Sequence, residues 1–323
     1  MGMRSPTIQP LIIITVIICL WLAAIIPLAP FLVAILMSIL LGALLFISPT
    51  PPIKDEPPKQ SSELEIAQKV QSKLLSLDHP SIEGIKIAKK CVPAASLGGD
   101  FYTFNTKQYP NINKDKQQPG IIQLQTQANQ FLGISIGDVA GHGISSALIM
   151  ALSSGLIDRI AQRHDDPKQT LEKTNDTLFK FINNTQVSHI TCFYGLLNTQ
   201  NYELRYAKAG HPPPFVLHAD GSIDELTANG CILGAFEKEE YEEKTAQLNP
   251  GDKVYFYTDG LIEATRNMDT KQGSDLLKSL IISSQQSPIE DQIDYIFEQI
   301  NAPKESINSD DQTLVILELS PTQ

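Results

Sequence analysis

Four short stretches of the 323-residue chain place aspartate beside glycine or a second acid where an apolar segment begins or ends. Asp100 lies in LGGDFY, Asp138 in ISIGDVAGHG and Asp259 in YFYTDGLIEA, while Asp310 and Asp311 precede an apolar segment in NSDDQTLVIL. Each stretch alone is also typical of a turn or a helix cap, because aspartate and glycine favour both. If these segments are strands that meet at one sheet edge, the carboxylates converge and repel one another unless cations lie between them.

Converging carboxylates predict a site for hard divalent cations. Mg²⁺ and Mn²⁺ prefer oxygen ligands and keep bound water. Two such ions about 3.5–4 Å apart can activate a bridging water and hold a phosphoryl group for in-line attack. The chain has 25 basic and 36 acidic residues, a net charge of -11, which argues against binding of nucleic acid. Cations at the acidic residues would supply the positive charge that an anionic substrate needs.

The segments around these acids predict many short strands and a few helices. Strands are expected at residues 85–91, 101–105, 121–127, 131–137, 190–198, 203–210, 215–219, 243–248, 253–259 and 313–319. Helices are expected at residues 62–76, 143–163, 167–184, 274–284 and 288–300. Strands that follow one another favour antiparallel hairpins, with helices covering the sheets, so the predicted class is α+β. The polar stretch 105–120 is predicted to be a solvated loop.

The N-terminal region differs in composition from the rest, because residues 11–47 include no charged side chain. At about 1.5 Å per helical residue this run is nearly twice as long as one crossing of a roughly 30 Å hydrocarbon layer requires. Pro27 and Pro30 interrupt it, so we expect two short helices, at about 11–26 and 31–47. The sequence therefore predicts a transmembrane helical hairpin.

The orientation of this hairpin follows from its flanking charges. Arg4 precedes it and Lys54 follows it, which favours the cytoplasmic side for both ends. We therefore expect a multi-pass protein of the inner (cytoplasmic) membrane whose catalytic domain faces the cytoplasm. The alternative is a cleaved signal peptide, but the apolar run greatly exceeds the apolar core of such a signal and lacks an obvious small-residue cleavage site.

The predicted domain layout has four parts. These are a hairpin at 1–47, a proline-rich linker at 48–61, a linker or switch helix at 62–82, and a domain at 83–320. Ser62 and Glu65 form a capping-box pattern at the start of the helix. Its apolar stripe has two possible partners: the domain behind it, or a second copy of helix 62–76 in a homodimer.

The motifs, taken in chain order, resemble the SpoIIE/RsbU-like branch of the PPM family of metal-dependent Ser/Thr protein phosphatases. The resemblance covers about residues 63–320 and rests on LGGDFY, IGDVAGHG, AKAGHPPPF, LNPGDKVYFYTDGLIEA and DDQTLVIL. It implies an α-β-β-α sandwich of two mainly antiparallel sheets flanked by helices. It also implies hydrolysis of phosphoserine or phosphothreonine by a hydroxide that bridges two Mn²⁺ or Mg²⁺ ions. The implied substrate is a phosphorylated STAS-domain anti-sigma-factor antagonist.

The resemblance also implies roles for individual residues. Asp138 matches the aspartate that bridges the two metal ions, and the carbonyl of Val139 matches the backbone ligand beside it. Asp100 matches the acid that helps to hold one metal site, directly or through water. Asp259 and Asp310 match the acids of the other site.

Three further residues have less definite roles. Asp311 occupies the position next to a ligand and is expected to orient it. His142 could protonate the leaving seryl oxygen, or it could orient its loop through a hydrogen bond. His211, in AGHPPP, is expected to be structural. A different class of function, a catalytically silent PPM-fold module that binds a phosphoprotein, stays open as the alternative to an enzyme.

Overall fold

The structure is a computed structural model, and it describes residues 14, 16–18, 21, 59–76, 79–109, 129–141, 143–182, 189–264, 269–302 and 310–320. The chain divides into two compact units, Met1–Lys59 and Gln60–Gln323. In the first unit, the described positions between 14 and 21 are helical. The rest of the predicted transmembrane hairpin, most of the proline-rich linker and the predicted strand 121–127 lie outside the described residues, so these remain predictions.

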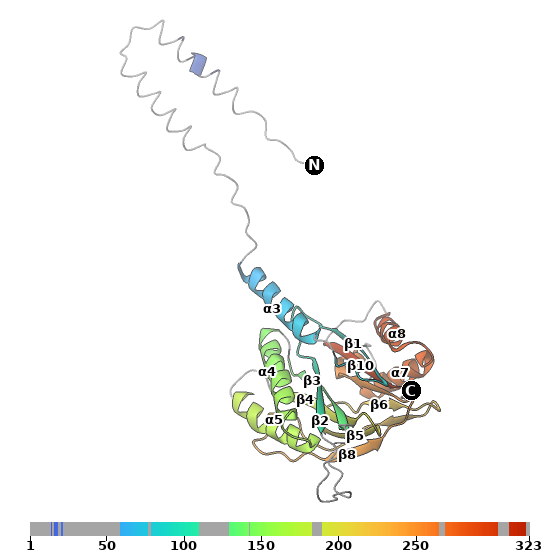
Figure 1. The fold of residues 1–323 in the computed structure, drawn as a ribbon. Coiled ribbons are helices and arrows are strands. Elements are labelled where there is room, and N and C mark those ends of the chain that lie inside the picture. Colours follow the sequence, from blue (N-terminus) through green and yellow to red (C-terminus); the bar gives the residue numbers. More distant parts are fainter. Residues whose placement is uncertain are drawn as a thin grey trace, which may run out of the picture. The chain divides into compact units, whose positions relative to one another are not determined.

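The described part of the second unit is a sandwich of two antiparallel sheets, each with five strands (Figure 1). The first sheet has the order β1-β10-β9-β6-β7, with bounds Ile85–Val92, Gln312–Leu319, Lys253–Tyr257, Phe215–Leu217 and Ile223–Glu225. The second has the order β2-β3-β4-β5-β8, with bounds Phe101–Tyr109, Asn129–Val139, Ile190–Asn198, Glu203–Ala209 and Glu243–Gln247. The predicted α-β-β-α sandwich is thereby confirmed.

The three middle strands of the first sheet, β10, β9 and β6, are buried on both faces. In β10, Val315 and Leu317 contact the core between the sheets, whereas Leu314 and Ile316 contact the helices outside. Successive side chains of a strand point to opposite faces, so a strand buried on both sides reads as a continuous apolar run. This is why TLVILEL has no polar alternation until Glu318.

Helices cover the outer face of each sheet. Two helices, α4 (Ile144–Ala161) and α5 (Pro167–Ile182), pack on the second sheet, and three, α6 (Asp259–Glu263), α7 (Thr270–Ser284) and α8 (Ile289–Asn301), pack on the first. α4 is the one helix among the described residues that is long and apolar enough to span a membrane by length and composition. It packs against β2, β3 and α5, with Met150 and Ile157 buried.

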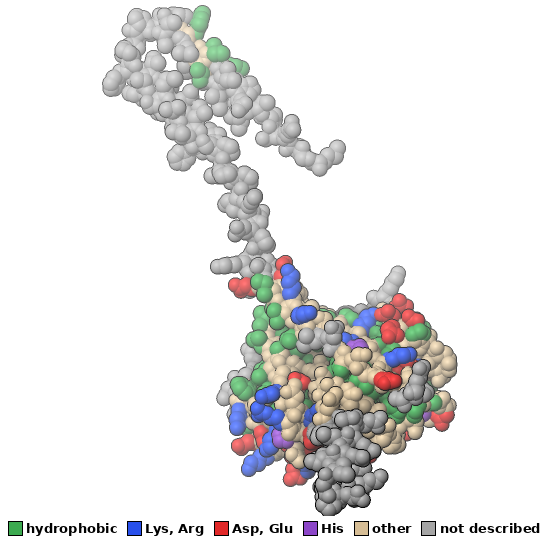
Figure 2. Space-filling model, in the orientation of Figure 1, with side chains coloured by type: hydrophobic (Ala, Val, Ile, Leu, Met, Phe, Trp, Pro, Cys, Tyr) green, Lys and Arg blue, Asp and Glu red, His purple; other side chains and the backbone are tan. Residues whose placement is uncertain are grey.

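The helix before the sandwich, α3 (Lys59–Leu75), begins three residues earlier than the capping-box pattern predicts. Its one buried side chain among those described is Gln71. Ile66, Val70 and Leu74 recur every fourth residue and are exposed, and Figure 2 shows hydrophobic side chains at the surface over α3 and α4. Of the predicted apolar stripe, Val70 and Leu74 are exposed, whereas Leu64 and Ala67 are half-buried. The helix packs on the core between the sheets through Leu75, while part of its stripe stays at the surface.

Several local features differ from the expectations: β7 was not predicted, and α7 begins four residues before its predicted start. The predicted loop at 105–120 starts too early, because β2 continues to Tyr109 and pairs with β3 along its whole length, from Phe101 opposite Gly137 to Tyr109 opposite Asn129. The five-residue helix α6, which begins at Asp259, was not predicted. Pairing with a strand distant in sequence overrides the polar composition of 105–109.

Candidate metal centre

One end of the sandwich collects three of the predicted acids. Asp138 lies near the end of β3, the strand paired on both sides by β2 and β4. Asp259 lies two residues after the last residue of β9, and Asp310 lies two residues before the first residue of β10. β9 and β10 are antiparallel neighbours, with Tyr257 opposite Leu314, so the end of one strand lies beside the start of the other.

The three carboxylates of Asp138, Asp259 and Asp310 are called here the acidic cluster. Each offers one oxygen atom, and these three atoms lie within 4.8 Å of one another. All three residues are partly buried. Because Asp138 comes from one sheet and the other two from the opposite sheet, the cluster forms only when the sandwich closes. Its role as a metal site is a prediction that the geometry permits.

The electrostatics of the cluster also suit a cation. The pKa of Asp138 is raised from 3.8 to about 7, first by burial and then by the negative charges of Asp259, Asp310 and Asp311. Carboxylates held this close repel one another, and binding of a proton or a cation reduces that repulsion. An all-carboxylate donor set fits hard ions such as Mg²⁺ and Mn²⁺ rather than soft metals.

Asp100 is buried behind the cluster and is not one of its three members. Its Oδ2 accepts hydrogen bonds from the hydroxyls of Thr258 at 2.8 Å and Thr313 at 2.6 Å. Its Oδ1 is buried and has no hydrogen-bond partner in the described part of the chain. Burial, followed by the charge of Asp138, raises the pKa of Asp100 well above its usual value.

Asp311 differs from its neighbour Asp310, because both of its oxygens are engaged by backbone. Oδ1 accepts a hydrogen bond from the amide of Ala94 at 2.7 Å, and Oδ2 accepts one from the amide of Gly99. Asp311 thus anchors the loop that leads to Asp100. This arrangement leaves Asp310 as the acid of the pair whose carboxylate belongs to the cluster.

The backbone of this loop lies against the other predicted ligand, the carbonyl of Val139. The amide of Val139 donates to the carbonyl of Gly99 at 3.3 Å. A Cβ at Gly99 would lie 2.5 Å from the carbonyl oxygen of Val139 and 3.2 Å from Oδ1 of Asp138. Only glycine lets the two segments approach this closely.

Of the two histidines considered from the sequence, His211 lies within the described residues. His142 lies outside the described residues, so its role stays a prediction. His211 is buried, and its Nδ1 lies 2.9 Å from the hydroxyl of Thr191, the residue opposite Asp138 in the β-ladder. Burial and then the charge of Lys208 lower the pKa of His211 to about 3. A ring held neutral beside the second sheet fits the structural role expected for it.

Helix α3 contacts the loop that leads to Asp100 through one side chain. The side-chain Nε2 of Gln71 donates to the carbonyl of Gly98 at 2.7 Å, and its Oε1 accepts from the backbone amide of Gly98 at 3.1 Å. The hydroxyl of Tyr102 also donates to the carbonyl of Leu75 at 2.6 Å. Because Gly98 precedes Gly99 and Asp100, the position of the helix is coupled to the loop behind the cluster.

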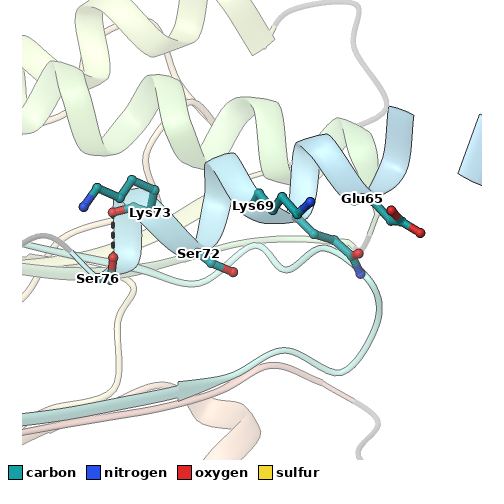
Figure 3. A pocket seen from close by; sticks show the side chains of 6 residues that line it. Glu65, Lys69, Ser72, Lys73 and Ser76 are labelled. Atoms are coloured by element: carbon teal, nitrogen blue, oxygen red, sulfur yellow. Dashed lines mark hydrogen bonds between the residues drawn. The ribbon is translucent and has the colours of Figure 1, made fainter. Parts of the chain in front are cut away.

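Two surface hollows lie along α3. One, of about 510 Å³, is lined by five residues of the helix, among them Glu65, Lys69 and Ser72, and by Ser76 just after it (Figure 3). The other, of about 750 Å³, lies between the helix and β1 and includes Gln71 and Cys91. Neither is lined by a residue of the acidic cluster, so we assign no catalytic role to them.

The protein without metal is expected to lose stability as the pH rises from about 4 to about 7. The folded state holds the proton of Asp138 more tightly than the unfolded state does, so unfolding releases that proton within this window and becomes easier as the pH rises. Melting temperatures at a series of pH values, with and without Mn²⁺, would measure this. Added Mn²⁺ should remove the fall, and a metal-free melting temperature that increases over the window would contradict the repulsion described above.

Residues that sequence reasoning missed are Thr258, Thr313 and Gln71. Both threonines are fully buried, and each lies within two residues of an acid already singled out. Their hydroxyls meet Asp100 only through the pairing of distant strands. Thr258 lies in the motif YTDG and Thr313 in DDQT. The sequence alone does not indicate that either threonine contacts the aspartate of LGGDFY.

Known proteins share this architecture. Residues 129–320 match the family described as Stage II sporulation protein E (SpoIIE). The chain is 29% identical over 257 residues to the phosphoserine phosphatase RsbU of Bacillus subtilis (strain 168), an alignment covering 79% of this chain and 70% of RsbU. The SiaA-PP2C domain of Pseudomonas aeruginosa matches with a TM-score of 0.61 and 19% identity, over 81% of this chain and 98% of that one. RsbX in complex with magnesium matches with a TM-score of 0.52 and 16% identity, over 75% and 99%.

The two-sheet sandwich with acids at one end, together with these relatives, defines a protein serine/threonine phosphatase of the PPM, or PP2C, class. The family match covers more than half of the chain. The chain belongs to the SpoIIE family. The predicted resemblance to the SpoIIE/RsbU-like branch is confirmed.

Proposed function

We propose that this phosphatase removes phosphate from phosphoserine or phosphothreonine of a partner protein with the help of two Mn²⁺ or Mg²⁺ ions. The observation that carries the proposal is the acidic cluster, whose three carboxylates are brought together from both sheets. Asp138, Asp259 and Asp310 would hold the ions, with the carbonyl of Val139 and the carboxylate of Asp100 beside them. When bound, divalent ions activate water and stabilise charge on phosphoryl oxygens.

The residues around the acidic cluster would hold the ligand groups in place. Asp311 fixes the loop at Gly99, so Asp100 and the Val139 carbonyl keep their places. His142, four residues after Asp138, stays the candidate general acid.

The substrate and the cellular setting belong to the same proposal. RsbU is a phosphoserine phosphatase, and by analogy we propose a phosphorylated STAS-domain anti-sigma-factor antagonist as the substrate. The uncharged run 11–47 supports a hairpin in the inner membrane with the phosphatase domain in the cytoplasm. The exposed stripe of Ile66, Val70 and Leu74 supports a homodimer through α3.

Hydrolysis of a phosphoserine peptide by the purified full-length chain tests the proposed reaction. We expect release of phosphate with Mn²⁺ or Mg²⁺ and none after EDTA treatment, because the cluster cannot bind phosphate without cations. Asp259→Asn should abolish the metal-dependent rate, whereas Asp275→Asn, an exposed acid in α7, should leave it unchanged. Wild-type protein that binds the peptide but releases no phosphate with either metal would favour the silent binding module.

A further inference from the structure

Two threonine hydroxyls converge on one oxygen of a buried carboxylate. Thr258, at the end of β9, and Thr313, in β10, belong to the first sheet, whereas Asp100 immediately precedes β2 of the second. Both hydroxyls bond to Oδ2 of Asp100, at 2.8 and 2.6 Å. All three residues are at most 2% exposed. The contact therefore joins the two sheets directly behind the acidic cluster.

The direction of one of these hydrogen bonds is fixed by its surroundings. The amide of Thr313 donates to the hydroxyl oxygen of Thr258 at 3.0 Å. A hydroxyl has only one proton to donate, and the Asp100 oxygen at 2.8 Å is much nearer than the alternative acceptor, the carbonyl of Asp311 at 3.5 Å. Thr258 therefore donates to Asp100 while it accepts from the backbone of β10.

The other oxygen of Asp100 is left without a protein donor. Oδ1 is buried and has no hydrogen-bond partner among the described residues. A buried polar atom without a partner is uncommon and calls for an explanation, such as an ion or a water bound there. Asp100 directly follows Gly99, where a Cβ would lie 3.2 Å from Oδ1 of Asp138, and the Asp100 and Asp138 carboxyl groups interact through a hydrogen bond. Asp100 therefore lies beside the acidic cluster.

We propose that Thr258 and Thr313 are positioning residues that hold Oδ2 of Asp100, so that Oδ1 alone is presented to the metal ions, directly or through a bound water. This inference rests on the metal-dependent function proposed above. Outer partners that orient a metal ligand commonly contribute 10–100-fold to metal affinity or activity. The same hydrogen bonds also tie the two sheets together at the cluster, because they connect strands of different sheets.

The test replaces each hydroxyl by a methyl group of similar size. Thr258→Val and Thr313→Val are expected to weaken Mn²⁺ binding to the full-length protein, measured by titration calorimetry, by about 10–100-fold. Thr258→Ser and Thr313→Ser keep the hydroxyl and should restore wild-type affinity. Thr245→Val, on the exposed side of β8, is the matched control and should bind Mn²⁺ as the wild type does.

The outcomes separate this inference from the proposed reaction. Folded valine variants with wild-type Mn²⁺ affinity would overturn the positioning role even if the wild type hydrolyses phosphoserine. Weaker binding that serine restores would support it even if the wild type proves inactive, since affinity is measured without turnover. If a valine variant does not fold, cysteine, which keeps a weak donor of similar size, takes its place. The serine variant is then expected to bind Mn²⁺ more tightly than the cysteine variant. Equal Mn²⁺ affinities of the two variants would contradict the proposal.

Discussion

Replacement of Asp138 by asparagine is expected to lower the metal-dependent rate of phosphoserine hydrolysis by about 10³-fold or more. Asp138 is the one member of the acidic cluster that comes from the second sheet, so its loss leaves only the pair from the first. Cations that stabilise a phosphoryl group contribute several kcal/mol, and about 4 kcal/mol corresponds to a factor of roughly 10³. Rates with Mn²⁺ and affinities for Mn²⁺ should fall together.

The same substitution should not destabilise the protein in the absence of metal. Burial and the charges of Asp259 and Asp310 disfavour an ionised Asp138, and a neutral amide removes that repulsion. We expect Asp138→Asn to melt at the wild-type temperature or above it at pH 8 in EDTA. A variant that is inactive because it is unfolded would contradict this, and so would one that keeps the wild-type rate. Asp275→Asn in α7 serves as the control for an exposed acid.

Replacement of Gly260 by alanine is expected to damage both stability and activity. A Cβ at this position would lie 2.1 Å from the carbonyl oxygen of Asp311 and 3.2 Å from the Cβ of Asp310. The first neighbour is backbone and cannot rotate away, so the start of β10 must shift. Overpacking of this kind costs about 1–3 kcal/mol of folding free energy. A displacement on the order of 1 Å at the cluster could lower the rate by about 10²-fold.

A second glycine provides the matched control. Gly155 lies within α4, and a Cβ there meets nothing within 4 Å. Gly155→Ala should raise the free energy of unfolding by about 0.5–1 kcal/mol, because alanine favours the helix, and leave the rate unchanged. Denaturant unfolding and hydrolysis rates measure both variants. Gly260→Ala with wild-type stability and rate would show that β10 can move without cost to the site.

Most of the strands and the α+β class were predictable from sequence because the strands and turns have strong local signals, whereas the α-β-β-α sandwich was implied by the family resemblance. Continuous apolar runs such as TLVILEL end at clear turn residues, and the acids lie at those ends. Convergence of Asp259 and Asp310 follows once β9 and β10 are known to be antiparallel neighbours. Which strands are neighbours, however, depends on contacts between distant residues, and the strand order within each sheet was not predicted.

The arrangement around Asp100 illustrates what could not be predicted. Its two threonine partners are 158 and 213 residues away in the chain. Gln71 meets Gly98 across 27 residues and through a side chain that looks like an ordinary polar residue of an exposed helix. Such contacts depend on side-chain direction in the folded state, which composition and periodicity do not encode. The metal roles of the site residues, including that of His142, remain predictions.

The pairing of β1 with β10 has a consequence for how the protein is made. Ile85 lies opposite Leu319, and Asp310 precedes the same strand, so the first sheet and the acidic cluster both need residues from the far end of the domain. A chain emerging from the ribosome cannot complete either until β10 has been translated. Contacts this distant in sequence also form slowly. The first sheet and the acidic cluster are therefore expected to be among the last parts of the sandwich to form.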